Sequence, residues 1–278
     1  MTAPDPRSAL AERIAAAWAG LSPQEQRVAD FLRAEPDESA LYNSSELARR
    51  TGVSKATVSR LFRRLGFAGS QEAREVLRAQ RAAGLPVLLE DPDDPLAAQI
   101  ARDVEHLRRL AVDVDRTALQ EAAAALAAAP RVVVAGFRSA YPLAMLLRQA
   151  LVQVRPDVRL VPETGQTLGE ELVGLDADDV VVLVGLRRRP AGFARTLDAM
   201  RAATPDLLVV ADPTLRRGPE RWRFDVPVQS ASPFDSYAAA ACLLSVLAGE
   251  VLHARGAAGA ERVAAVDRAY ASLGELDA

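Results

Sequence analysis

The stretch from Asn43 to Phe67, NSSELARRTGVSKATVSRLFRRLGF, is the feature that most constrains the fold of this chain. It predicts two short helices joined by a tight turn. Asn43 can cap the first helix, and Glu46 lies three residues on, where its side chain can return the hydrogen bond in a capping box. Gly52 supplies the backbone freedom that ends this helix, and Ser54 can cap the second one. The stretch therefore predicts a helix-turn-helix.

The second of these helices has one apolar face and one polar face. Four apolar residues fall at the i, i+3, i+4 and i+7 spacing of a buried helical face, namely Val58, Leu61, Phe62 and Leu65. Small polar and basic residues occupy the other face. This division predicts a recognition helix that packs on its own domain and presents its polar side outward.

The basic charge of the chain is local. Its net charge is −3, yet the stretch from Asn43 to Phe67 is rich in arginine and has Glu46 as its one acidic residue. Duplex DNA carries about one negative charge per 1.7 Å of its axis, so a cationic helix that fits the major groove is complementary to it. An amphipathic helix pair inside an all-α domain is the structural alternative. The coincidence of caps, turn, spacing and charge favours a double-stranded DNA operator as the partner.

The predicted DNA contacts divide by side chain. Lys55, Ala56 and Ser59 are expected at base edges, whereas the arginines are expected at phosphates. The full set of predicted DNA-binding residues is Ser54, Lys55, Ala56, Thr57, Ser59, Arg60, Arg63 and Arg64.

The length of 278 residues favours two domains, and a hydrophobic fraction of 50% is enough for two cores. We predict an all-helical domain at residues 1–82 and a linker at residues 83–95, where prolines and acidic residues prevent a continuous helix. The remaining residues, 96–278, form the second predicted domain.

The second domain alternates buried strands with helices, which predicts a mainly parallel five-stranded sheet in an α/β sandwich. The predicted strands are the runs at 131–136, 158–161, 180–184, 207–211 and 224–228. The predicted helices are 96–114, 117–129, 141–153, 168–172, 190–202, a long one that opens at 232–236 and ends near 255, and 258–276.

Ligands of such a sheet bind at the carboxyl ends of its strands, where the loops lead into helices. A helix N-terminus flanked by serine or arginine is suited to an anion. The candidate ligand-binding residues of these loops are Gly136, Arg138, Ser139, Gln166, Thr167, Arg187, Arg188, Arg189, Ser232, Asp235 and Ser236. Several of them have a plainer alternative, because Ser139, Ser232 and Asp235 can be helix caps. The run Arg187–Arg189 can be a solvated charge run or an interface patch.

Other site classes have little support in the sequence. The loop after the first strand lacks the second and third glycines of a dinucleotide fingerprint, and no Cys/His cluster suggests a metal, so neither a cofactor nor a metal is predicted. The single cysteine, Cys242, lies in an apolar run and is expected to be buried. No apolar run approaches the length of a membrane span, which predicts a cytoplasmic protein without membrane contact.

The chain resembles RpiR-type (MurR/RpiR family) bacterial transcriptional regulators over nearly its whole length. The resemblance rests on LSPQEQRVADFLRAEP and SSELARRTGVSKATVSRLFRRLGFAGSQEAR in the first domain. It implies a winged-type helix-turn-helix domain followed by a sugar isomerase (SIS) domain, an αβα sandwich that binds phosphosugars and forms dimers or tetramers. It places Ser139 on a conserved serine of the first SIS loop, Gln166 and Thr167 near the second, and Ser232–Ser236 at the start of the C-terminal helix.

One loop departs from the family pattern. After the third strand the family has a serine-rich loop that cradles phosphate, whereas this chain has VGLRRRPAG with Arg187–Arg189. The predicted effector is therefore a small anion, either a sugar phosphate or a carboxylate-bearing sugar derivative. Effector identity, operator sequence, sign of regulation and the choice between dimer and tetramer do not follow from the sequence.

Two other functions stay open. One is a sugar-phosphate isomerase, which needs a base to move a proton, with Glu170 or Glu171 as candidates. His106 and His253 lie in predicted helices away from the loops and are expected to be structural or exposed. The other is a regulator whose SIS-like domain only oligomerises. A ligand-responsive transcription factor without enzymatic activity is the favoured interpretation.

Overall fold

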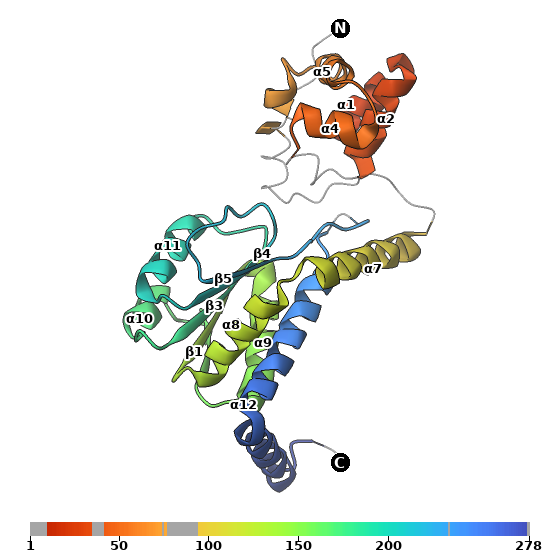
Figure 1. Ribbon diagram of the computed structural model, residues 1–278. Coiled ribbons are helices and arrows are strands. Elements are labelled where there is room, and N and C mark those ends of the chain that lie inside the picture. The colour runs from red at the N-terminus through yellow and green to blue at the C-terminus, as the bar shows by residue number, and fades with distance from the viewer. Residues whose placement is uncertain (1–9, 35–41, 74, 77–93, 233, 277–278) are drawn as a thin grey trace. The chain divides into compact units, whose positions relative to one another are not determined.

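The computed structural model describes residues 10–34, 42–73, 75–76, 94–232 and 234–276 (Figure 1). The chain divides into two compact units. One contains the residues up to Pro95 with Ala231–Asp235, and the other contains Leu96–Ser230 and Ser236–Ala278. The predicted boundary between residues 82 and 83 lies outside the described residues, as does most of the predicted linker.

The first unit is helical where it is described. Its helices are α1 (Leu10–Ala17), the 3-10 turn η1 (Trp18–Gly20), α2 (Pro23–Ala34), α4 (Ser44–Thr51) and α5 (Lys55–Arg64). Residues 70–73 and 75–76 are also helical, and the rest of the helix expected after Gly69 lies outside the described residues. Side chains of α1, α2, α4 and α5 share one hydrophobic core, with Ile14, Val28, Leu47 and Phe62 at its centre.

The local signals of the helix-turn-helix are confirmed. The side chain of Asn43 accepts hydrogen bonds from the backbone of Ser45 and Glu46, while its own N–H donates to the Glu46 carboxylate at 2.7 Å. Gly52 ends α4 with a φ of 66°, a left-handed conformation that favours glycine. Ser54 accepts from the N–H of Thr57 at 3.1 Å and begins α5.

The second unit contains the predicted five-stranded sheet, and every pairing in it is parallel. Its strands are β1 (Val132–Gly136), β2 (Val158–Val161), β3 (Val180–Gly185), β4 (Leu207–Ala211) and β5 (Trp222–Asp225), in the order β2-β1-β3-β4-β5. The last strand begins two residues before the predicted one and ends before Val226. The buried Val226 and Val228 follow it without extending the ladder, although an apolar run alone does not distinguish them from the strand.

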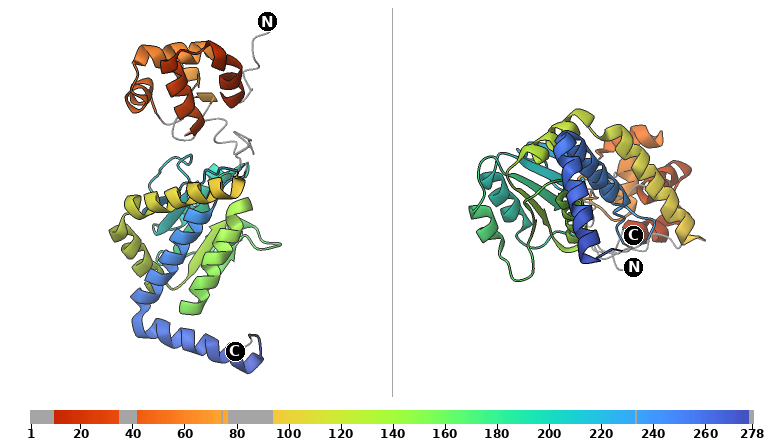
Figure 2. Two further views of the ribbon diagram at one scale, coloured as in Figure 1. Left: turned by 90° about the vertical axis from the view of Figure 1, so that its right-hand side faces the viewer. Right: turned by 90° about the horizontal axis from the view of Figure 1, so that it is seen from below.

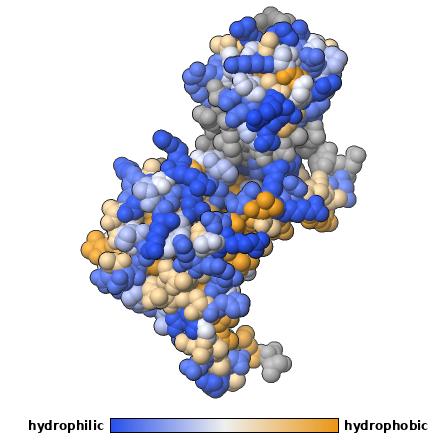
Figure 3. All heavy atoms as spheres, in the orientation of Figure 1, coloured by the Kyte–Doolittle hydropathy of each residue, from blue (hydrophilic) through white to orange (hydrophobic). Residues whose placement is uncertain are grey.

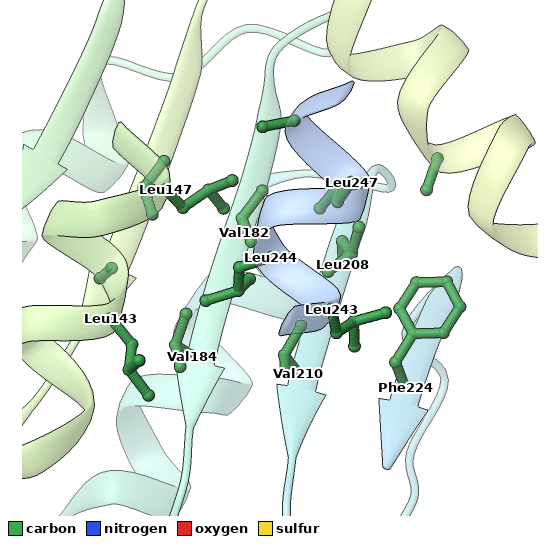
Figure 4. Packing of buried hydrophobic residues seen from close by; sticks show 14 of the residues in the cluster. Leu143, Leu147, Val182, Val184, Leu208, Val210, Phe224, Leu243, Leu244 and Leu247 are labelled. Carbon is green, nitrogen blue, oxygen red and sulfur yellow. The ribbon is translucent and has the colours of Figure 1, made fainter. Parts of the chain in front are cut away.

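Helices cover both faces of the sheet. One face packs against α8 (Arg116–Ala128), α9 (Tyr141–Val154) and the first part of α12 (Ala238–Leu273). Figure 4 shows this layer, in which Leu243, Leu244 and Leu247 of α12 lie over the strands. The other face packs against α10 (Leu168–Val173) and α11 (Phe193–Ala203). The predicted αβα sandwich is therefore confirmed.

The helix α12 changes direction at Gly256, whose backbone is not helical (Figure 2). Within the described residues, α12 is the one helix long and apolar enough to cross a membrane by length and composition. Its first part packs against α8 and α9, as a core helix of a globular domain does. Cys242 is exposed, which corrects the expectation of a buried thiol. The cysteine lies between the buried positions Ala240 and Leu243, on the side of the helix turned away from the core.

Candidate functional site

The two faces of α5 are separated as the sequence predicts. Val58, Leu61 and Phe62 are fully buried, whereas the polar side of the helix is accessible. Most of the predicted DNA-binding residues are exposed, and Ser59 is half-buried; the exposed ones are Ser54, Lys55, Ala56, Arg60, Arg63 and Arg64. The surface of this unit that faces the viewer in Figure 3 is mostly hydrophilic. The helix α5 thus packs on the core of the first unit with its apolar face and exposes a cationic face to solvent.

Thr57 does not belong to that face. Its side chain is 1% exposed, and its hydroxyl hydrogen-bonds with Ser54 at 2.9 Å and with the side chain of Gln24 at 3.4 Å. Arg60 also donates to this hydroxyl, at 3.2 Å. The position of Thr57 on the first turn of α5 directs its side chain toward α2, and its predicted contact with DNA stays a prediction.

The arginines of α5 differ in the number of contacts that their guanidinium groups make within the first unit. Arg64 donates to the carbonyl of Gly20 and lies 3.4 Å from the carboxylate of Glu25. Burial raises the pKa of Glu25, but the hydrogen bonds from Ser22 and the charges of Arg64 and Arg60 outweigh burial and lower the pKa overall. The guanidinium of Arg63 has no partner among the described residues. Arg63 is therefore the arginine most available to a phosphate.

In the second unit, the strand order creates a switch point between β1 and β3. The chain leaves β1 toward α9 on one face of the sheet and leaves β3 toward α11 on the opposite face. Such a divergence of neighbouring loops opens a crevice at the carboxyl ends of the strands, where α/β sheets bind their ligands. The loops after β1 and β3 both carry residues that the sequence singled out.

The loop after β1 combines one packing residue with two accessible polar ones. A Cβ added at Gly136 would lie 2.7 Å from the Cβ of Ala144 and 2.8 Å from the carbonyl oxygen of Ala140, so the close approach of α9 accounts for this glycine. Arg138 is exposed with a φ of 55°, and Ser139 is half-buried. Neither side chain has a hydrogen-bond partner in the part of the chain that the structure describes. Both residues thus lie unengaged at the carboxyl end of β1.

The loop after β2 contributes a second accessible hydroxyl. Thr167 is exposed before α10, and its side chain makes no cap hydrogen bond. Gln166, in contrast, is used internally, because its side chain accepts from the N–H of Glu163 at 2.8 Å and donates to Glu171 at 3.3 Å. Of the two residues predicted here, Thr167 has the free group among the described residues.

In the loop after β3, one of the three arginines is engaged by neighbouring residues of the same unit. Arg189 donates from Nε to the carbonyl of Gly185 at 2.8 Å, from Nη1 to the hydroxyl of Thr214 at 2.9 Å, and from Nη2 to the carboxylate of Asp212. Burial lowers the pKa of Arg189, and the charge of Asp212 acts in the opposite direction. Arg187 is also buried, while Arg188 is half-buried. Arg189 is therefore engaged by its own domain, and its contact with a ligand stays a prediction.

Asp212 is the residue of this site that the sequence analysis missed. It follows β4 directly, at the carboxyl edge of the sheet, and is 1% exposed. An acidic residue after a buried apolar run was the available signal. A pocket of about 380 Å³ lies beside this pair, between α11 and the segment after β4, and its lining includes Arg189, Phe193 and Leu215.

Two serines of the loop before α12 form hydrogen bonds with side chains of α7 (Pro95–Asp113). The hydroxyl of Ser236 donates to the carboxylate of Asp103 at 2.6 Å, and that of Ser230 hydrogen-bonds with Gln99. The hydroxyl of Ser232 instead hydrogen-bonds within its own turn, to the carbonyl of Phe234 at 3.2 Å. The helix begins only at Ala238, so Ser232 and Asp235 do not cap it.

The comparisons with known proteins agree with this two-part organisation. Residues 8–84 match the family model described as the helix-turn-helix domain of the rpiR family. The uncharacterised HTH-type transcriptional regulator YfhH of Escherichia coli K12 is 31% identical over 91 residues, which are 33% of this chain and 31% of that protein. The chain thus matches about a third of the length of this curated relative.

Two solved structures share the fold of this chain. The sugar isomerase domain of an RpiR transcription factor from Sphaerobacter thermophilus is 18% identical with a TM-score of 0.56, over 64% of this chain and 99% of that one. The NanR protein of Vibrio vulnificus, in complex with ManNAc-6P, is 17% identical with a TM-score of 0.58, over 95% of this chain and 99% of that one. The first unit of this chain matches the helix-turn-helix domain of the rpiR family, and its second unit has the fold of a sugar isomerase domain. The predicted family resemblance is confirmed.

Among the described residues, no group of three or more His, Cys, Asp or Glu side chains is placed to hold a metal ion. Of the two histidines, His106 is buried in α7 and His253 is exposed on α12. Burial and the nearby charge of Arg102 lower the pKa of His106. Neither histidine lies in the loops at the carboxyl edge of the sheet.

Proposed function

We propose that this chain is a cytoplasmic transcriptional regulator that binds double-stranded DNA through α5 and senses a small anionic metabolite through its SIS-like domain. The observation that carries the proposal is the preformed recognition helix. Its N-cap, its buried face and its exposed Lys55, Ala56 and Arg63 exist without DNA, so little ordering is needed for the helix to enter a major groove. Lys55, Ala56 and Ser59 are proposed to contact base edges, and Arg60, Arg63 and Arg64 phosphates.

A homo-oligomer is part of this proposal. Two copies would place two recognition helices on half-sites related by two-fold symmetry. The exposed apolar residues of α7 support self-association, because Leu96, Ile100, Val104 and Leu107 form one stripe, with Leu96 70% exposed. Hydrophobic residues also interrupt the hydrophilic surface of the second unit in Figure 3. We expect light scattering to show that the protein is a dimer or a tetramer in solution.

The effector is proposed to bind at the carboxyl ends of β1 and β2. Arg138, Ser139 and Thr167 supply one cation and two hydroxyl groups that have no partner among the described residues. A guanidinium and hydroxyls are suited to a carboxylate or a phosphate on a sugar. The structure of NanR with ManNAc-6P makes sugar phosphates one class to test, and sugar acids are the other.

We propose no catalytic activity. An isomerase needs a carboxylate within reach of its substrate, and Glu171 is already bound to Gln166 and lies 3.8 Å from Arg159. Glu170 lies on α10 and is exposed. Turnover of a hexose phosphate that disappears in Glu170→Gln or Glu171→Gln would overturn this part of the proposal.

The test begins with selection of duplexes from a randomised pool on the full-length protein. Binding of the selected duplex is then measured by fluorescence anisotropy with and without a panel of sugar phosphates and sugar acids. A compound that shifts the DNA affinity must bind the two conformational states of the protein with different affinity. Failure to enrich any sequence would overturn the DNA-binding proposal, and an affinity unchanged by every compound would count against effector sensing.

A further inference from the structure

The carboxylate of Asp212 accepts four hydrogen bonds from groups of its own unit. One carboxylate oxygen accepts from the backbone N–H of Arg187 at 2.8 Å and from the guanidinium of Arg189. The other accepts from the N–H of Thr214 at 3.0 Å and from its hydroxyl. With 1% of the residue exposed, these bonds are shielded from water. The carboxylate is therefore fully satisfied by protein donors.

Two of these four donors belong to the loop after β3. A backbone N–H and a guanidinium that converge ahead of a helix are also the groups that bind a phosphate. Here the negative charge that they bind comes from the neighbouring strand, because β3 and β4 are paired and the end of β4 lies beside the end of β3. Separating the pair would leave the buried carboxylate of Asp212 without its charged donor, which is strongly unfavourable.

We propose that Asp212 is a specificity-determining residue that occupies the anion-binding position of the β3 loop with its own carboxylate. This inference rests on the proposed effector sensing and names the ligand class. A phosphate monoester, with a charge of about −1.5 to −2, is excluded from this loop by the buried negative charge. The effector is a sugar derivative with a single carboxylate, bound on the β1 and β2 side.

The charges on that side agree with a monoanion. Arg138 contributes one exposed guanidinium beside Ser139, which balances one carboxylate. A dianionic phosphate is usually held by several positive or N–H donors together. In this chain, the guanidinium of Arg189 and the N–H of Arg187 already donate hydrogen bonds to Asp212.

The experiment uses isothermal titration calorimetry on the full-length protein with glucose 6-phosphate, N-acetylmannosamine 6-phosphate, inorganic phosphate, gluconate, glucuronate and glucose. Wild type is expected to bind one of the sugar acids, with that binding lost in Arg138→Ala and retained in Arg189→Gln. Asp212→Asn keeps the size of the side chain and removes its charge. We expect this variant to bind inorganic phosphate or a sugar phosphate at least tenfold more tightly than wild type does.

Asp212→Glu is the matched control, because it retains the negative charge and should continue to exclude phosphate. Adding Arg189→Gln to Asp212→Asn should abolish the gained phosphate binding. If Asp212→Asn does not fold, wild type decides the question by its melting temperature in sodium phosphate and in sodium chloride of equal ionic strength. Phosphate stabilises folded proteins in general by its exclusion from their surface, so a rise that is the same in wild type and Arg189→Gln is expected. A rise in wild type that Arg189→Gln removes would overturn the inference.

The outcomes separate the two proposals. Tight binding of a sugar phosphate by wild type that depends on Arg189 would overturn the role of Asp212 and leave effector sensing intact. An affinity for phosphate that is the same in wild type and folded Asp212→Asn would also overturn it. If Asp212→Asn gains phosphate binding while wild type binds no sugar acid, the role of Asp212 stands, and both effector sensing and the assigned ligand class fail.

Discussion

Ser236 donates a hydrogen bond of 2.6 Å to Asp103, and this contact connects the loop before α12 to the first helix of the second unit. Asp103 also accepts from Gln99 at 3.0 Å, and Gln99 hydrogen-bonds with Ser230. Two residues one turn apart on α7 thus bind both ends of a single loop. The buried residues of α7, His106 and Leu110, both lie in its second half. Side-chain hydrogen bonds therefore hold its first half.

We predict that Asp103→Ala loosens the first half of α7. Removal of the carboxylate leaves Ser236 without its acceptor and costs about 1 kcal/mol, the usual net value of such a bond. A loss of about 1 kcal/mol raises the equilibrium constant for local opening roughly fivefold. The amide hydrogens of residues 96–104 should therefore exchange roughly fivefold faster. Glu105→Ala is the control, because it removes only the partly exposed pair with Arg109. Equal exchange in the two variants would contradict the prediction.

The stability of the second unit is predicted to depend on Glu220 at acid pH. Burial raises the pKa of Glu220, but hydrogen bonds from Arg201, the N–H of Gly218 and Arg223 outweigh burial and lower the pKa from 4.5 to about 2. Because the folded pKa is below the unfolded one, the carboxylate stabilises the fold above pH 4.5. That contribution is lost as the pH falls toward 2.

The measurement is urea unfolding of wild type and Glu220→Gln from pH 7 to pH 2.5. The difference in unfolding free energy is expected to be about 3 kcal/mol near neutral pH, from the size of the pKa shift. It should be constant from pH 6 to 7, which serves as the internal reference, and should shrink below pH 4.5. A difference that stays the same at pH 2.5 would show that the ion pairs of Glu220 do not carry the effect.

Gly136→Ala is predicted to destabilise the second unit without any ligand. The added methyl group would overlap Ala144 and the backbone of Ala140, and overpacking of this kind costs about 1–3 kcal/mol. The midpoint of urea unfolding should fall accordingly. Gly169→Ala is the matched control, since nothing lies within 4 Å of its added Cβ on α10. That control should be neutral or slightly stabilising, because alanine favours helix. If Gly136→Ala unfolded at the same urea concentration as wild type, the packing role of Gly136 would be refuted.

Arg63→Ala is predicted to weaken binding to selected and unrelated duplexes alike. One phosphate contact contributes about 0.9 to the slope of log affinity against log salt concentration, so the slope should fall by about that amount. Fluorescence anisotropy at several salt concentrations measures it. Arg268→Ala removes an exposed arginine of the second unit and should leave the slope unchanged. A slope that Arg63→Ala does not alter would remove Arg63 from the interface.

The sequence predicted those parts of the structure that depend on neighbours along the chain. Asn43, Gly52 and Ser54 fix the ends of α4 and α5 through hydrogen bonds within four residues, so their pattern is sufficient. The parallel sheet followed from alternating buried runs and helices, which leave few other arrangements. The strand β5 was displaced because Val226 and Val228 continue the apolar run beyond the ladder.

The tertiary structure decided which polar groups are available to a ligand or to DNA. Arg189 and Asp212 are 23 residues apart, and only the pairing of β3 with β4 brings them together. Thr57 is removed from the DNA-facing side by contact with α2, and Ser236 is engaged by α7, again through distant partners. A side-chain hydrogen bond depends on the position of both partners in space. For that reason the sequence specified where the candidate loops lie, and only the packing showed which of their groups are already occupied.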